Sequence, residues 1–317
     1  MRRNRFVVTG LKIAAVIGFM LLAQPGQATN NPLGLFKNYF VTGDVASVGA
    51  SIRGSGNSAT NLSAVQTLDA GCKPGDAVHF DCVPQSVDGV NTDIIAAFLY
   101  WEVIEKTAKP SGAKGMALDP GVGHAPPNPN PGQGGFLSYS NLSFFGEPIG
   151  ADHAAPCWSS GGGTGSSNGA PTLRVYRADF LRYLEVDPLT GQRIPFARVQ
   201  LPDSGSNGAG VPLTEGASLV VVYRNYKLPF RGVVFYDGSF TMNNQTDSLN
   251  QTIYGFYEAS ELPADLKAKV TFIVGDGQAN FPEILLLGTS PPMPNQFIGP
   301  SLLQTPDFKG FRAEKNC

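Results

Sequence analysis

The sequence has few charged residues and lacks the motifs of common catalytic, cofactor-binding and metal-binding sites. Only 15% of its 317 residues are charged, and the net charge is −2. A mildly acidic chain of this kind lacks the basic surface with which nucleic-acid-binding proteins neutralise phosphates. The sequence has no phosphate-binding loop, no Cys/His dyad and no dinucleotide fingerprint. It also has no Cys-x-x-Cys motif, and its three histidines are scattered, which argues against structural zinc. We therefore expect no nucleic-acid partner, no bound cofactor other than calcium (considered below) and no catalytic residues.

Long apolar runs are also absent, except at the N-terminus. Residues 1–28 are typical of a secretory signal peptide, because four basic residues precede the apolar run 13–23 and small residues precede Thr29. A highly basic signal of the ordinary kind is favoured over the twin-arginine signal that Arg2 and Arg3 could form. Removing those four positive charges takes the net charge from −2 to −6. We expect a secreted protein of the periplasm, cell surface or extracellular space, with no membrane span after signal removal.

Four cysteines follow the signal peptide, and in an exported chain they favour disulfides. Cys72 and Cys82 flank the turn sequence 73–76, so we predict that these two are bonded. Four cysteines allow three pairings. A bond between Cys157 and Cys317 follows only by elimination, and this pairing stays open.

Runs rich in β-branched and aromatic residues dominate the rest of the chain. In the runs 93–105 and 216–224, apolar residues occupy both faces of the expected strand, which is typical of a strand covered on both sides. A further run, 231–238, follows a break that contains Pro229. We predict a β-hairpin over residues 217–237 at the centre of the core.

The remaining pattern predicts an all-β fold: an antiparallel β-sandwich, or a jelly-roll-like one, with long Gly/Pro-rich loops. One short helix is predicted over 177–184. Residues 110–135, half of which are Gly or Pro, predict a flexible loop insertion. The expected division is a signal peptide over 1–28, one β-sandwich domain over 29–290 and an irregular tail over 291–317. The other predicted strands cover 36–42, 46–52, 136–145, 173–176, 194–201, 251–257, 269–274 and 283–287.

Four segments follow one another along the chain: 94–102, 174–180, 216–223 and 233–238. In this order they resemble the core strands of a group of uncharacterised exported and cell-surface proteins of bacteria and archaea, a β-sandwich type of unknown function. The similarity covers most of the chain from about residue 38 to about residue 287. It implies an exported surface module, and it assigns no role to any residue, because the matching segments are core strands and bear on the fold alone.

Two aromatic residues are candidates for ligand binding. Trp158 lies beside Cys157 in a glycine-rich loop, and Tyr139 follows another Gly/Pro-rich stretch. An exposed ring on a rigid β scaffold is suited to stacking on a sugar. For Trp158, packing over a neighbouring disulfide is the alternative. Trp101, in the middle of an apolar strand, is expected to be a core residue.

Residues 203–208 resemble the start of a calcium loop, with Asp203 and Asn207 as candidate ligands. The match is incomplete, because Gly205 stands where Asp or Asn is wanted and Thr214 stands where the loop needs a bidentate Glu. A solvated turn is the alternative interpretation.

Two patterns that suggest catalysis are incomplete. Residues 165–169 match Gly-x-Ser-x-Gly, with His153 nearby, but no strand precedes the serine and no helix follows it. Glu102 and Glu105 are three apart on a predicted strand and should point to opposite faces, so they do not form a paired-carboxylate site.

The sequence thus predicts an exported, non-catalytic interaction module of the cell surface or extracellular matrix, with a role in adhesion or glycan binding and an extracellular protein or glycan as its partner. The alternative is a secreted hydrolase that acts on glycans with an active site on its loops. Acids or histidines clustered in a concave face would favour the enzyme. A flat face with isolated aromatic residues would favour the binding module.

Overall fold

The fold is built from antiparallel β-strands, which confirms the predicted all-β class. The computed structural model describes residues 29–51, 65–73, 82–106, 110–118, 141–154, 171–187, 190–204, 211–241, 249–255, 271 and 273. Its elements are β1 (Thr29–Asn30), β2 (Gly34–Ser51), β3 (Val65–Asp69), β4 (Ser86–Val87), β5 (Val90–Asn91), β6 (Asp93–Lys106), β7 (Lys114–Ala117), β8 (Leu142–Phe145), β9 (Glu147–Ala154), β10 (Pro171–Asp179), the 3-10 helix η2 (Leu181–Tyr183), β11 (Phe196–Gln200), β12 (Leu213–Arg224), β13 (Phe230–Asp237) and β14 (Leu249–Asn250).

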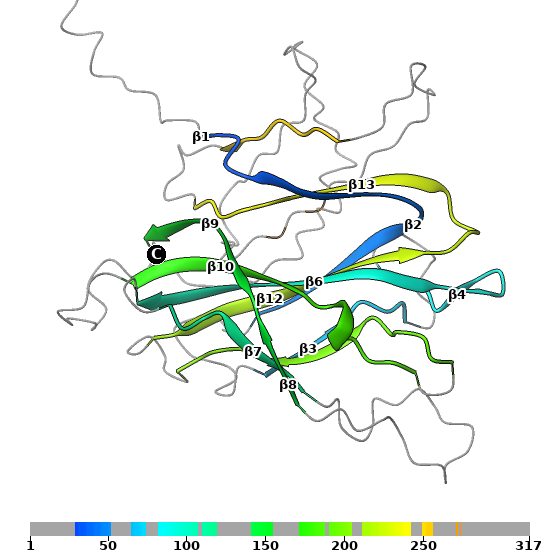
Figure 1. Cartoon of the computed structure of the whole chain (residues 1–317), viewed down its shortest axis with the longest axis horizontal. Helices are drawn as coiled ribbons and strands as arrows, with labels where there is room; N and C mark the ends of the chain where they lie inside the picture. The colour runs from blue at the N-terminus through cyan, green and yellow to red at the C-terminus, as the bar shows by residue number, and fades with distance from the viewer. Residues whose placement is uncertain are drawn as a thin grey trace, which may run out of the picture.

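The strands form a layered sandwich around a central sheet. The largest sheet has the order β13-β2-β12-β6-β10-β9, and a second sheet has the order β3-β11-β7-β8. The second sheet covers one face of the central strands β12, β6 and β10, whereas β13 and the first half of β2 lie over the other face (Figure 1). No helix in the described part is long and apolar enough to cross a membrane.

Strand β2 is one continuous strand, where the sequence predicted two. Its second half, 43–51, pairs with β12, and its first half, 34–42, pairs with β13. The Thr42–Gly43 peptide shows how the partner changes: the Thr42 carbonyl accepts from the Asn225 N–H at 2.9 Å, and the Gly43 N–H donates to the Pro229 carbonyl at 3.2 Å. Because the N–H and C=O of one trans peptide point to opposite sides, β12 lies along one edge of β2 and β13 along the other.

The predicted hairpin over 217–237 is therefore wrong. Both of its strands exist, but each pairs with β2, and no pairing among the described residues joins β12 to β13. Residues 225–229, which we call the crossover, carry the chain across β2 instead of reversing it. We call β13 together with residues 34–42 of β2 the ribbon.

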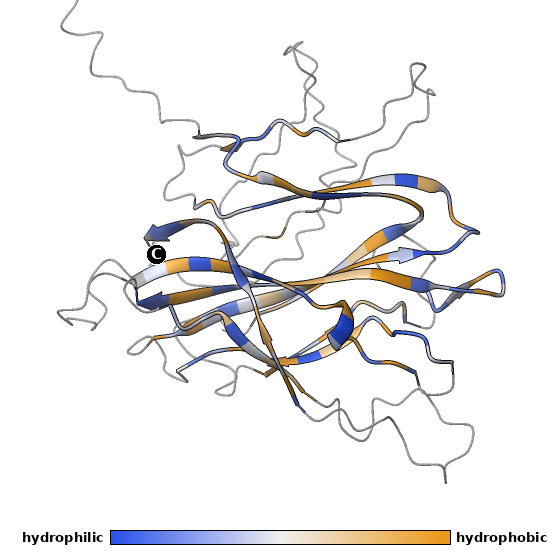
Figure 2. Ribbon diagram, in the orientation of Figure 1, coloured by the Kyte–Doolittle hydropathy of each residue, from blue (hydrophilic) through white to orange (hydrophobic). Residues whose placement is uncertain are grey.

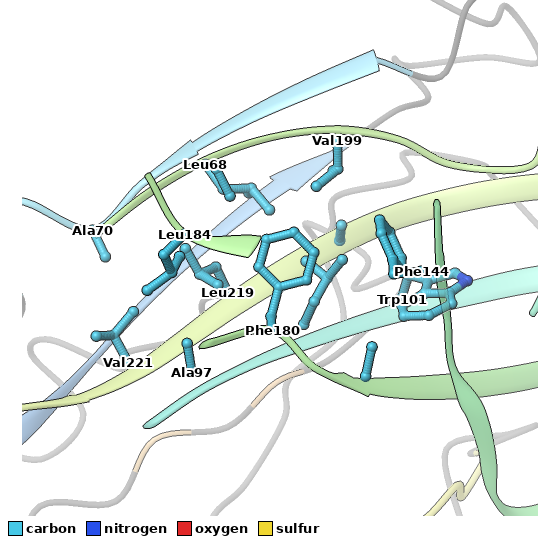
Figure 3. Close-up of a cluster of buried hydrophobic side chains, with 14 of the residues drawn as sticks. Leu68, Ala70, Ala97, Trp101, Phe144, Phe180, Leu184, Val199, Leu219 and Val221 are labelled. Atoms are coloured by element: carbon cyan, nitrogen blue, oxygen red, sulfur yellow. The ribbon is translucent and has the colours of Figure 1, made fainter. Parts of the chain in front are cut away.

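The larger hydrophobic core lies between the central sheet and the four-stranded sheet, and Figure 3 shows part of it. Trp101, Phe180 and Leu219 are fully buried there. The opposite side chains of β12, Val220 and Val222, pack under the ribbon in a second core. This alternation confirms that the 216–224 strand is covered on both faces, and the central strands are accordingly apolar along much of their length (Figure 2).

The helix predicted over 177–184 is also wrong. Arg177 to Asp179 continue β10, which stays paired with β6 as far as the contact between Asp179 and Phe98. Only Leu181–Tyr183 form a short 3-10 helix. The β-ladder bonds the backbone of residues 177–179, so tertiary pairing overrides the local helical pattern.

Two further predictions need correction. The flexible loop predicted over 110–135 is wrong at its start, because Lys114–Ala117 form β7 between β11 and β8, and residues 119–135 lie outside the described residues. Gly115 makes this pairing possible, since a Cβ atom there would lie 2.2 Å from the Phe144 ring. The strand predicted over 251–257 is absent from its described residues 251–255. Residues 283–287, most of 269–274 and the tail 291–317 lie outside the described residues.

Candidate functional site

The outer face of the ribbon carries two exposed aromatic rings. Phe40 on β2 is 50% exposed and Phe230 on β13 is 65% exposed. Their ring centroids are 6.5 Å apart, and the ring planes differ by 16°. We call these two residues the ring pair. The rings are thus near-parallel and stacked, and together they form an exposed apolar patch.

The strand register explains why the two rings meet. Phe40 pairs with Gly232, and Phe230 pairs with Thr42, so the rings are diagonal neighbours on one face of the ribbon. Gly232 is exposed and has no side chain; a Cβ atom there would lie 3.5 Å from the Phe40 ring. The strip beside Phe40 therefore stays flat.

The crossover beside the ring pair is held by Asn225, which is 2% exposed. Its side-chain amide donates to the Val90 carbonyl at 2.9 Å and contacts the Thr92 hydroxyl, and its Oδ1 accepts from the Lys227 N–H at 3.0 Å. Such a short polar side chain stabilises a turn through its own backbone contacts. The next residue, Tyr226, is 70% exposed and adds a third ring at this end of the ribbon.

An apolar layer supports the ribbon from beneath. Phe98 of β6 meets Phe36 edge-on at 5.1 Å and Phe235 at 5.8 Å between centroids. Val41 and Val233 point into the same layer from the two ribbon strands. The ring pair is thus displayed on a surface that side chains on its other face hold in position.

An ionic cluster ties the far end of the ribbon to the central sheet. Arg177 of β10 forms ion pairs with Asp237 of β13 and Glu147 of β9, and its guanidinium carbon lies 3.4 Å from the centre of the Phe36 ring. Burial raises the pKa of Asp237, and the contact with Arg177 opposes this rise. Burial, together with the neighbouring Asp237 charge, raises the pKa of Tyr100, whose hydroxyl lies 3.3 Å from Asp237. Tyr100 therefore stays a neutral donor.

A second polar cluster lies at the end of β6. The fully buried Glu105 accepts hydrogen bonds from the Gly112 N–H at 2.7 Å, from Arg174 at 3.0 Å and from the Tyr176 hydroxyl. Arg174 also binds Asp152, and this hydrogen bond lowers the pKa of the Asp152 carboxyl. Glu105 has no exposed surface, so this cluster fixes the strands and offers no acid to a substrate.

The predicted disulfide between Cys72 and Cys82 is confirmed, with the two Cα atoms 4.8 Å apart. The loop that it closes is next to a β-bridge between Gly71 and Val83. Cys157 and Cys317 lie outside the described residues, so the second pairing stays a prediction.

The structure places Asp203 in a role that needs no calcium. Its carboxylate accepts a hydrogen bond from the Thr214 N–H at 2.8 Å, at the start of β12. Asn207 lies outside the described residues. Among those that are described, no three His, Cys, Asp or Glu residues come together in a way that would hold a metal ion. The calcium prediction thus has no support from Asp203.

The other predicted residues divide into core residues and residues that the structure does not describe. Trp101 is in the core, as predicted, and its indole N–H donates to the Gly112 carbonyl at 2.8 Å. His153 contacts the Ser239 carbonyl through Nε2 at 3.0 Å. The candidate aromatic residues Trp158 and Tyr139 and the motif serine Ser167 lie outside the described residues.

Sequence reasoning missed the ring pair, although a signal for half of it was present. In the run from Phe230 to Phe235, Val233 and Phe235 share one face and Phe230 and Gly232 share the other. Once the apolar pair Val233 and Phe235 is assigned to the core, Phe230 must point outward. Its neighbour Phe40 is distant in the sequence and is brought there only by the strand register.

Comparisons with protein-family models, with curated proteins and with solved structures found no match to this chain. The resemblance to exported surface modules therefore stays a prediction.

Proposed function

We propose that this protein is an exported, non-catalytic interaction module that binds an extracellular glycan through the ring pair. One observation carries the proposal: Phe40 and Phe230 are exposed and form a near-parallel pair on a ribbon that is supported from beneath. Exposed apolar groups that cluster on a rigid scaffold mark interaction sites, and aromatic residues contribute most to such contacts.

Exposed rings with polar side chains beside them favour a glycan over a globular protein. A sugar ring presents C–H groups on its flat face and hydroxyls around its rim, so an exposed phenyl ring can pack against one sugar face. The exposed Asn38 and the partly exposed Thr42 flank Phe40 along β2 and offer polar groups to the hydroxyls. A protein partner is the competing outcome of the binding test.

The hydrolase alternative gains no support from the described residues. The two acid clusters described above are built around arginines: Glu147 and Asp237 bind Arg177, and Glu105 and Asp152 bind Arg174. A glycosidase needs one carboxyl group free to give up a proton and a second open to the substrate. In these two clusters each carboxylate is instead bound by an arginine side chain, so neither cluster supplies that pair.

The test compares wild type with the double variant Phe40→Ala/Phe230→Ala on a glycan array and, for any glycan retained, by titration calorimetry. The matched control is Phe145→Ala, because Phe145 is 69% exposed but lies on β8 in the other sheet. We expect the double variant to bind at least about tenfold more weakly, since a central aromatic contact is typically worth more than about 1 kcal/mol. Undiminished binding by the double variant, or an equal loss in Phe145→Ala, would contradict the proposal.

A further inference from the structure

Every residue that the strand register places on the outer face of the ribbon is uncharged. Besides the ring pair, these residues are Leu35, Asn38, Thr42, Gly232, Val234 and Tyr236. Tyr236 shares this face with Val234 by alternation along β13, and Leu35 shares it because it pairs with Tyr236. The outer face thus offers apolar groups, one amide and hydroxyls.

The charged residues of the ribbon point to its other face. They are Lys37, Arg231 and Asp237. Lys37 Nζ lies 5.5 Å from the centre of the Phe98 ring beneath the ribbon, and Arg231 forms an ion pair with the buried Asp44 at 2.9 Å. Asp237 belongs to the ionic cluster described above. A charged ligand would therefore meet no opposite charge on the outer face.

A further aromatic ring stands on the outer face, away from the ring pair. Residues 249–255 lie on the side of the ribbon that faces away from the central sheet (Figure 1). The Tyr254 N–H donates to the Tyr236 hydroxyl at 2.6 Å, and this hydroxyl donates to the Tyr254 carbonyl at 3.4 Å. Gly255 has φ of 95°, and a Cβ atom there would lie 3.6 Å from the Val234 side chain. The backbone of Tyr254 is thus held against the ribbon, while its side chain is 67% exposed.

The two aromatic positions lie far apart along the ribbon. Phe230 and Tyr236 are six residues apart on β13, which is about 20 Å along a strand. Leu35 and Ile253, which are 52% and 42% exposed, add apolar surface at the end where Tyr254 lies. One sugar unit is too small to contact both ends, so a ligand that uses both must be a chain of sugars.

We propose that Tyr254 is a second sugar-binding residue, and that the ligand is an uncharged glycan chain long enough to contact Tyr254 and the ring pair at once. This inference rests on the proposed function and adds to it the charge and the extent of the glycan. Once one end of such a chain is bound, contact at the other end is intramolecular, so affinity rises with chain length.

The test measures the affinity of wild type for neutral glucan, mannan and xylan oligosaccharides, from disaccharide to hexasaccharide, and for oligogalacturonates of the same lengths. For the neutral series that binds best, we expect the hexasaccharide to bind at least about tenfold more tightly than the disaccharide. Tyr254→Ala should weaken hexasaccharide binding by about tenfold and leave the disaccharide that binds the ring pair unaffected. Tyr254→Phe keeps the ring and should bind as wild type does.

Two controls separate this inference from its rivals. Phe145→Ala removes an exposed ring from the other sheet and should leave every affinity unchanged. Lys227→Gln removes a charge in the crossover, where Lys227 Nζ lies 5.5 Å from the centre of the Tyr226 ring, and should also change nothing. Tighter binding of oligogalacturonates, lost in Lys227→Gln, would show that the ligand is acidic and would overturn the inference.

The remaining outcomes distinguish a failure of this inference from a failure of the proposed function. Equal affinity for short and long neutral glycans, or full affinity in Tyr254→Ala, overturns the second site but leaves the ring pair standing if Phe40→Ala/Phe230→Ala still loses binding. Full binding by that double variant contradicts the proposed function, and binding to no glycan contradicts both. A wild-type dimer that Tyr254→Ala breaks, measured by sedimentation, would assign the outer face to a second copy of the chain and overturn the inference.

Discussion

The two faces of the central sheet are covered in different ways. On one face, Phe144 of the four-stranded sheet is 1% exposed, and the two residues that its ring contacts, Trp101 and Phe180, are 0% exposed. On the other face, the ribbon contributes Phe36, Tyr39 and Phe235, which are only partly buried. A two-stranded ribbon is narrower than a sheet and excludes water less completely.

The ribbon face compensates for this partial coverage with charge. Arg177 binds two carboxylates and lies on the Phe36 ring, so its cluster joins both ribbon strands to β9 and β10. We infer that the four-stranded-sheet side carries most of the stability. The ribbon side is secured only as firmly as is needed to display the ring pair.

The largest effect should come from truncating one large side chain on each face. Trp101→Ala should lower the free energy of unfolding by about 3–5 kcal/mol, because its rigid, fully buried neighbours cannot close the cavity. Phe98→Ala, under the ribbon, should cost about 3 kcal/mol or less, since the partly buried Phe36 and Phe235 can move into the space. Denaturant unfolding of both variants measures the difference. A greater loss for Phe98→Ala would reverse the comparison.

The Arg174 cluster, on the side of the four-stranded sheet, should contribute more to stability than the Arg177 cluster, on the ribbon side. Arg174→Met leaves the fully buried Glu105 without its charged partner and should lower the free energy of unfolding by about 3–5 kcal/mol. Arg177→Met should cost less, about 1–2 kcal/mol, because the Glu147 side chain is 63% exposed and returns to water, and Asp237, 14% exposed with a raised pKa, can take up a proton. Thermal or denaturant unfolding tests both, and adding Glu105→Gln to Arg174→Met should recover part of the loss. Equal costs for the two arginine variants would mean that the ribbon is secured as strongly as the core.

Asp237 and Asp152, one from each cluster, should make the free energy of unfolding depend on pH in opposite directions. Burial raises the pKa of Asp237 above its ordinary 3.8, so the native state holds this proton longer than the unfolded chain does. Its contribution to the free energy of unfolding therefore falls as pH rises from about 3.8 through the native pKa. The hydrogen bond from Arg174 lowers the pKa of Asp152, so its contribution is present above about pH 3.8 and is lost as pH falls through the lower native pKa.

Measuring unfolding from about pH 3 to about pH 7 tests this difference in Asp237→Asn and Asp152→Asn. The stability of wild type relative to Asp237→Asn should decrease as pH rises. Its stability relative to Asp152→Asn should increase. Slopes of the same sign in the two comparisons would contradict the assignment.

The smallest effect on stability should come from the ring pair. Because Phe40 and Phe230 are at least half exposed, Phe40→Ala/Phe230→Ala should lower the free energy of unfolding by less than about 1 kcal/mol. Its melting curve should stay close to that of wild type while glycan binding is lost. A loss as large as that of Phe98→Ala would show that the rings support the ribbon and are not available to a ligand.

Local sequence patterns predicted the structure correctly where the residues of one short segment are enough to define it. The apolar residues on both faces of 93–105 and 216–224 predicted buried strands, and β6 and β12 are buried as expected. The turn between Cys72 and Cys82 predicted their bond, because closing a short loop needs only local geometry. Patterns failed at 177–179 and 114–117, where the backbone is paired by strands that are distant in sequence.

The sequence by itself determined the all-β class, the strands with two apolar faces and the turn that joins Cys72 to Cys82, because each depends on the order of apolar, turn and cysteine residues along a short segment. Only the tertiary structure decided the partners of those strands. A break such as 225–229 suits a hairpin or a crossover equally well, and the choice depends on β2, more than 170 residues earlier in the chain. For the same reason the ring pair and the arginine clusters appear only in the fold: they join side chains that strand register brings together.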